Sequence, residues 1–168
     1  MTDKTDINRD AVIRMESRQW ADGERYDPVR LTTHGRLAYE AFDDVWRVSY
    51  DEDDASGAGS THTQVSLYPD GQVVLSRRGE EDMDIVFIKG DQRVEQKTTP
   101  FGLIHFSVLT HEVKGQLTED GGAIEVGYSL GFDHRHTIST TLQIDVETSG
   151  DDAPEQKRRP TSYGKLLS

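Results

Sequence analysis

Residues 65–75 read VSLYPDGQVVL, and this stretch decides the fold class. Two short runs of alternating apolar residues flank a Pro-Asp-Gly segment. Alternation of this kind is typical of a strand that buries one face, and the residues between the runs are typical of a tight turn. The same pattern continues in both directions, from about residue 13 to residue 146. Antiparallel strands in such a series close into a barrel or a sandwich, so the sequence predicts an all-β fold.

Outward from this hairpin, each further strand can be assigned by its alternation and its flanking turn residues. We expect a turn at Asp22-Gly23, a bulge or bend at His34-Gly35, and a bend in the longest strand near His111. We find no convincing helical period. The fold predicted is a single antiparallel β-barrel of about eight to ten strands. The predicted strands are 11–19, 28–41, 45–52, 62–68, 72–78, 83–89, 92–98, 101–117, 123–130 and 138–146.

The chain has 168 residues, which suits one domain with one core. We place the barrel domain at 11–147, after an N-terminal extension at 1–10 and before a polar tail at 148–168. Charged residues and proline crowd out apolar residues in that tail. A segment of this composition cannot bury enough apolar surface to order itself, so we expect a disordered or loosely ordered C-terminal tail.

Composition excludes several classes of function. Lys and Arg number 19 against 31 Asp and Glu, which gives a formal net charge of -12. Nucleic acids and anionic membrane surfaces would therefore be repelled overall. The absence of cysteine excludes disulfides, thiolate catalysis and Cys-ligated zinc. No apolar run reaches membrane-spanning length, and the first ten residues lack an apolar signal region, so we expect a cytoplasmic protein.

Several segments also carry a resemblance to a known family. These are 71–79 (GQVVLSRRG), 99–102 (TPFG) and 124–130 (IEVGYSL), together with Thr110, the Tyr50-x-Glu52 pair and the Thr33-x-Gly35 turn. They resemble the YwiB-like family of small bacterial proteins of unknown function. The resemblance covers about residues 13–146 and implies a calycin, or lipocalin-like, β-barrel. One departure is Lys97, which stands where relatives tend to carry an aromatic residue and implies a barrel mouth of different polarity.

Arg77 is the first candidate site residue. It shares a strand face with Val73 and Leu75, so alternation directs its guanidinium toward the apolar interior. An unpaired charge there would be very costly, and the site therefore needs a carboxylate or an anionic guest. Glu52 faces inward by the same alternation and is the natural internal partner. Two interpretations follow: a structural Arg-Glu pair near the barrel end, or a counter-charge for the carboxylate or phosphate of a ligand.

In the ligand interpretation, Tyr50 and Tyr128 supply hydroxyl groups, and Phe87, Phe101 and Phe106 form apolar walls. The first functional hypothesis is a non-catalytic barrel that binds a small amphipathic or anionic molecule at its mouth near Arg77, without a cofactor. Side chains can equally fill a barrel of this size. The alternative is therefore a protein-protein interaction or scaffold module with a filled barrel, working through a sheet edge or the two tails.

Catalytic and metal signatures are weak. His134 and His136 stand two residues apart near Asp133, but zinc needs three or four ligands, and a solvated loop explains these residues better. The acidic run 51–54 lacks the glycine and terminal glutamate of an EF-hand, and a solvated loop again suffices. Neither a Gly-x-Ser-x-Gly elbow nor a phosphate-binding loop occurs. We predict no metal site and no catalytic residues, and an unrecognised metal- or His-dependent hydrolase remains the lesser alternative. Oligomeric state stays open.

Overall fold

The computed structural model describes residues 5–53, 59–79, 82–132 and 136–149 and confirms the all-β prediction. The predicted tail beyond residue 149 lies outside these residues. No helix long and apolar enough to cross a membrane occurs in the described ranges. The strands are β1 (Ile7–Ala21), β2 (Glu24–Arg25), β3 (Val29–Glu40), β4 (Val45–Asp53), β5 (Ser60–Leu67), β6 (Val73–Arg78), β7 (Asp82–Phe87), β8 (Gln92–Thr99), β9 (Gly102–Thr118), β10 (Gly121–Gly131) and β11 (Thr137–Thr148).

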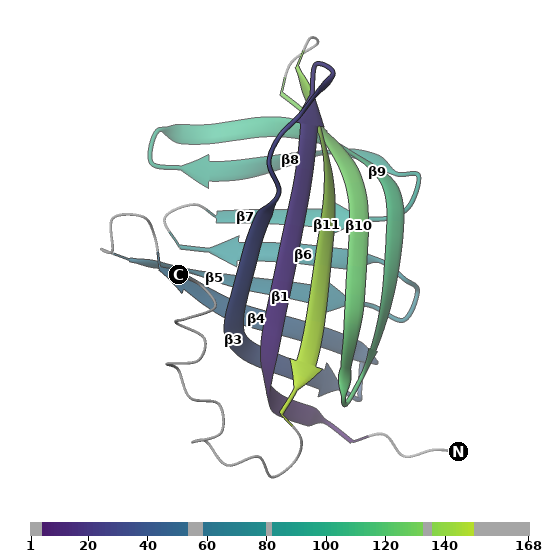
Figure 1. The fold of residues 1–168 in the computed structure, drawn as a ribbon. Helices are drawn as coiled ribbons and strands as arrows, with labels where there is room; N and C mark the ends of the chain where they lie inside the picture. Colours follow the sequence, from purple (N-terminus) through teal and green to yellow (C-terminus); the bar gives the residue numbers. More distant parts are fainter. Residues whose placement is uncertain (1–4, 54–58, 80–81, 133–135, 150–168) are drawn as a thin grey trace.

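Ten of these strands form a closed antiparallel ring, as predicted. From β3 to β11, each strand pairs with the next along the chain, and β1 closes the ring by pairing with both β3 and β11. The short β2 extends only the end of β1, across the predicted turn, where Asp22 (φ 53°) and Gly23 (φ 79°) are left-handed. Figure 1 shows β1, β10 and β11 crossing β4, β5 and β6 of the opposite wall at a steep angle. Closure leaves no long free sheet edge among the described strands.

The expected bend near His111 is confirmed as a β-bulge. Glu112 pairs with Gly127, whereas Thr110 pairs with Tyr128, so His111 is an extra residue on β9 without a partner position on β10. An extra residue of this kind bends its strand and increases the local twist. The bulge lets the longest strand curve around the barrel and returns Thr110 to the inward face.

Of the bulge or bend expected at His34-Gly35, the bulge does not occur. The register between β1 and β3 runs through both residues without a shift. The glycine is needed for a different reason: a Cβ at position 35 would lie 2.2 Å from the Ser49 carbonyl oxygen and 2.4 Å from Ile13 Cδ1. Gly35 therefore permits a close approach of strands and core side chains in an otherwise regular strand.

The weakest seam in the barrel wall lies between β7 and β8. Only two residue pairs join these strands, Asp82 with Thr98 and Met83 with Lys97. Further along β7, the backbone N–H of Val86 donates to the Glu95 carboxylate of β8 at 3.1 Å. A side chain thus replaces the backbone acceptor that a continued ladder would supply. The wall is closed here by fewer backbone contacts than elsewhere.

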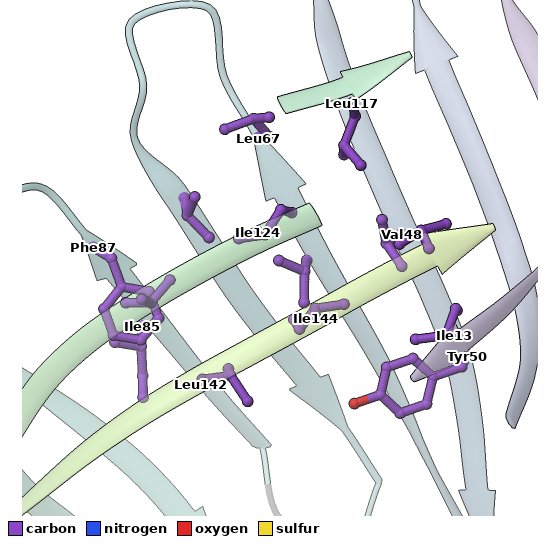
Figure 2. Close-up of a cluster of buried hydrophobic side chains, with 14 of the residues drawn as sticks. Ile13, Val48, Tyr50, Leu67, Ile85, Phe87, Leu117, Ile124, Leu142 and Ile144 are labelled. Atoms are coloured by element: carbon purple, nitrogen blue, oxygen red, sulfur yellow. The ribbon is translucent and has the colours of Figure 1, made fainter. Parts of the chain in front are cut away.

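Aliphatic and aromatic side chains pack the barrel interior toward one end, and a pocket of about 530 Å³ lies beyond them, lined by Tyr39, Trp46 and Leu117 among others. Figure 2 shows the packed side chains converging from strands on both walls, with Ile13, Val48 and Phe87 among those labelled. All three are fully buried, as is Ile124 on β10. This end lies where β3 finishes and β10 begins. The same strands carry polar inward residues toward the other end, and that change positions the candidate site.

Candidate functional site

A cavity of about 520 Å³ occupies the second end of the barrel. Its mouth lies where β4 and β6 finish and where β1 approaches the β2 turn. Apolar side chains from several strands line its depth, and polar ones lie toward the mouth. The apolar lining includes Met15, Leu31, Val65, Leu75, Ile85 and Leu142. The polar lining includes Gln19, Tyr50, Glu52, Thr63, Arg77 and Lys97.

Five of the lining residues form one continuous row across neighbouring strands. Tyr50 on β4 is opposite Thr63 on β5, which is opposite Arg77 on β6; Arg77 is opposite Met83, and Met83 is opposite Lys97 on β8. Residues directly opposite one another in antiparallel strands project from the same face of the sheet. One wall of the cavity therefore carries two cations and two hydroxyl groups side by side. We call this set the cationic row.

The predicted pairing of Arg77 with Glu52 is present as a loose ion pair. Arg77 Nη2 lies 3.9 Å from Glu52 Oε1, and the two side chains are 38% and 32% exposed. Arg77 therefore lies at the mouth of the cavity, and the expectation of a guanidinium in a dry interior is corrected. The reason is its position, because Arg77 is the last inward residue of β6 before that strand ends at Arg78. Water at the mouth lowers the cost of its charge.

Tyr50 and Thr63 lie deeper in the same row. Tyr50 is 3% exposed, and its hydroxyl donates to Met15 Sδ at 3.6 Å. Burial raises the pKa of Tyr50 far above its ordinary value; Glu52 adds to the rise, and Arg77 and Thr63 oppose it. Although Thr63 is close enough to affect Tyr50, its buried Oγ1 makes no hydrogen bond of standard geometry within the described chain. Both groups are neutral and have hydrogen-bonding capacity to spare.

Of the other predicted residues, Tyr128 and Phe106 line the cavity. Burial raises the pKa of Tyr128, which keeps its phenol neutral. Phe87 does not line the cavity; it is fully buried below it and packs on the Tyr128 ring, with centroids 4.7 Å apart. Phe87 thus supports the wall that carries Tyr128.

Phe101 is not part of this site. It lies in the turn between β8 and β9 and is 98% exposed, so it does not form an apolar wall of the cavity. The strand predicted from residue 101 begins at Gly102, whose φ of 122° is accessible to glycine. The same hairpin exposes three further apolar side chains, Val94, Leu103 and Ile104. Phe101 was predicted as an apolar wall, but the turn leaves its side chain in solvent.

Sequence reasoning did not single out Thr63, Met15 or Gln19. A signal for Thr63 exists, because the turn at 69–71 fixes the β5–β6 register and places Thr63 opposite Arg77. Met15 and Gln19 were visible only as members of an alternating strand. Nothing in that alternation distinguishes a residue that fills the core from one that borders a cavity.

Metal chemistry gains no support from the described residues. They contain no group of three or more His, Asp or Glu side chains placed to hold a metal ion. His134 and Asp133 lie outside the described residues, as does Asp54 of the acidic run. His62 pairs with Asp51 at 2.7 Å, and neither borders the cavity.

The comparisons with known proteins assign a family and a fold. The family described as Domain of unknown function (DUF1934) matches residues 13–144. The chain belongs to this family. The crystal structure of the ywiB protein from Bacillus subtilis matches the domain with a TM-score of 0.71 at 20% sequence identity, covering 84% of this chain and 94% of that one. This likeness confirms the YwiB-like resemblance at the level of the barrel fold.

A second solved structure is too dissimilar to inform the fold of this DUF1934 domain. It comes from a protein of unknown function from Bacteroides ovatus, with 12% identity, a TM-score of 0.35, and coverage of 87% of this chain and 43% of that one. No curated protein matches the chain. Function must therefore be argued from the cavity itself.

Proposed function

We propose that this protein is a non-catalytic carrier or sensor that binds a small anionic amphiphile in its barrel mouth. The observation that carries the proposal is the cationic row, in which Arg77 and Lys97 lie on one cavity wall with the hydroxyls of Tyr50 and Thr63. Guanidinium, ammonium and hydroxyl groups are the donors that bind carboxylate or phosphate oxygens. The ligand's charged head lies at this row.

The depth of the cavity suits the apolar part of such a ligand. Val65, Leu75 and Ile85 line the wall below the cationic row, and Leu142 and Ile144 line the wall across from it. Ligand sites are mostly apolar clefts of about 300 to 1,000 Å³ with a few placed polar groups, and this cavity of about 520 Å³ falls within that range. Burial of an alkyl chain here contributes affinity in proportion to its length.

The overall negative charge of the protein does not prevent anion binding at this wall. Exposed charges are largely screened beyond about 8 to 10 Å at physiological ionic strength, so the cations nearest the ligand dominate. Glu52 opposes the ligand, but its contact with Arg77 is long, at 3.9 Å. A ligand carboxylate can approach Arg77 closely without first displacing a short hydrogen bond.

The two alternatives receive less support. An interaction module with a filled barrel conflicts with the cavity at the mouth end. A hydrolase that uses histidine lacks its base at this site, because no histidine in the described part of the chain lines the cavity. We also propose that the protein is cytoplasmic. Native protein for the test should therefore be purified from the cytoplasmic fraction.

The test measures binding of decanoate and of decanol, which share an alkyl chain and differ in charge. We expect the wild-type protein to prefer decanoate, and Arg77→Ala to weaken decanoate binding about 10- to 100-fold, as the loss of charge-assisted hydrogen bonds predicts. Arg78→Ala is the matched control, because Arg78 follows in the strand but pairs with Asp84. Isothermal titration supplies the affinities, and native mass spectrometry of protein from cells identifies any co-purified molecule.

Equal binding of decanoate and decanol, or equal effects of the two arginine variants, would contradict a charged head at Arg77. If neither compound binds and no molecule is co-purified, the carrier proposal as a whole is rejected.

A further inference from the structure

A second polar row runs across the strands that the cationic row does not use. Gln19 on β1 is opposite Thr140 on β11, Thr140 is opposite Tyr128 on β10, and Tyr128 is opposite Thr110 on β9. Gln19 and Tyr128 line the cavity, and Thr110 and Thr140 are each only 2% exposed. Direct cross-strand partners project from the same face, so all four face inward. We call this set the neutral row.

The two rows lie on different walls of the barrel. The cationic row spans β4 to β8, whereas the neutral row spans β9, β10, β11 and β1. Figure 1 shows β10, β11 and β1 on one side of the barrel and β4 to β6 on the other. The tyrosines of the two rows lie at a similar depth in the barrel. Tyr50 is two residues before Glu52 on β4, and Tyr128 is two residues before Leu130 on β10; both Glu52 and Leu130 line the cavity.

The neutral row holds a buried hydroxyl whose hydrogen-bonding capacity is not fully used. Thr140 Oγ1 makes no hydrogen bond of standard geometry with any described residue. A weaker side-chain interaction with the Tyr128 phenol lowers the pKa of Tyr128 against the larger effect of burial. A buried hydroxyl left in this state is costly, and native proteins rarely keep one without a water, ion or ligand to satisfy it. Thr63 repeats the situation in the cationic row, on the opposite wall.

The chemistry of the neutral row differs from that of the cationic row. Its side chains are one amide and three hydroxyls, which both donate and accept hydrogen bonds. It contains no cation. A hydroxyl, carbonyl or amide group of a ligand can pair with such groups, whereas a second carboxylate would lose water without gaining a counter-charge.

We propose that the ligand carries a second, uncharged polar group that binds the neutral row, in addition to the anionic head at Arg77. The ligand class is thus a hydroxylated or oxygenated organic acid with an apolar segment between its two polar groups. This inference rests on the proposed function, since it needs an anionic ligand in the cavity. It goes further by assigning Tyr128 and Gln19, which line the cavity, as determinants of specificity, and Thr140 as a residue that positions the Tyr128 hydroxyl.

The test compares three acids at each of several chain lengths, from eight to twelve carbons: the simple acid, its ω-hydroxy derivative and the dicarboxylate. At the length that spans the two walls, we expect the ω-hydroxy acid to bind about fivefold more tightly than the simple acid, as one added hydrogen bond predicts. The dicarboxylate should bind more weakly than either.

Two variants assign the preference to the neutral row. Tyr128→Phe and Thr140→Val should each reduce the ratio of the affinity for the ω-hydroxy acid to the affinity for the simple acid. Circular dichroism and urea unfolding show whether the variants fold. Thr141→Val is the matched control, because Thr141 is the next residue on β11 and is only partly buried.

Equal binding of simple and ω-hydroxy acids at every length would overturn the neutral-row assignment and leave the anionic site at Arg77 intact. Tighter binding of the dicarboxylate would overturn it as well. Binding of none of these acids would overturn the proposed function itself, and the inference with it.

Discussion

The two ends of the barrel are built from the same strands yet differ in what fills them. At the closed end, β1, β4 and β7 contribute Ile13, Val48 and Phe87, all fully buried. At the mouth end, the same alternation on β1 and β4 presents Gln19 and Glu52 beside a cavity of about 520 Å³. A side chain that faces the barrel interior is therefore not always buried. The closed end supplies the packed core, and the mouth end keeps polar side chains around open space.

The largest expected difference between the two ends concerns packing. Phe87→Ala removes a fully buried ring at the closed end and should lower the free energy of unfolding by about 3 to 5 kcal/mol. Leu75→Ala borders the existing cavity and should cost about 1 to 2 kcal/mol, because fewer packed neighbours lose contact. Urea unfolding measures both. Similar losses for the two variants would mean that the mouth end is as tightly packed as the closed end.

The second prediction concerns the two buried tyrosines at the mouth end, whose ionisation should lower the stability of the protein at alkaline pH. Burial raises the folded-state pKa of Tyr50 and of Tyr128 above the ordinary value of 10.0. A raised folded pKa contributes stability that is fully present below pH 10 and is lost as pH rises toward the folded pKa, with a limiting slope of about 1.4 kcal/mol per pH unit for each tyrosine.

Tyr50→Phe should therefore flatten the decline in unfolding free energy between pH 9 and pH 11. Tyr26→Phe is the control, because Tyr26 is exposed. Urea unfolding at each pH supplies the slopes, and identical slopes for wild type and Tyr50→Phe would place the Tyr50 hydroxyl in water.

The smallest expected effect is a gain in stability. Thr63→Val replaces a buried hydroxyl that has no standard hydrogen bond with a methyl group of similar size, so the free energy of unfolding should rise by about 1 kcal/mol. Decanoate should bind more weakly to the same variant. Thr141→Val, at a partly buried position, should change neither quantity appreciably. A destabilised Thr63→Val would indicate that the hydroxyl is already satisfied in the free protein.

The residues of the site show which parts of it were predictable. Arg77 and Glu52 were predicted as inward partners, because alternation within a strand is a local property and the cost of an unpaired charge is general. Phe101 was predicted wrongly, because its strand begins one residue later and the side chain belongs to a turn. The extent of solvation at Arg77 was not predictable, since it depends on how close the end of β6 lies to the mouth.

By itself, the sequence determined the all-β class, the strands and their inward faces, since a period of two and the turn residues between runs act over a few neighbouring positions. Only the tertiary structure decided that Tyr50, Thr63, Arg77 and Lys97 share one row and that this row borders a cavity. The physical reason is that row membership follows from the register of several strands together, and open space follows from the combined volume of side chains on both walls. Neither quantity belongs to any single strand.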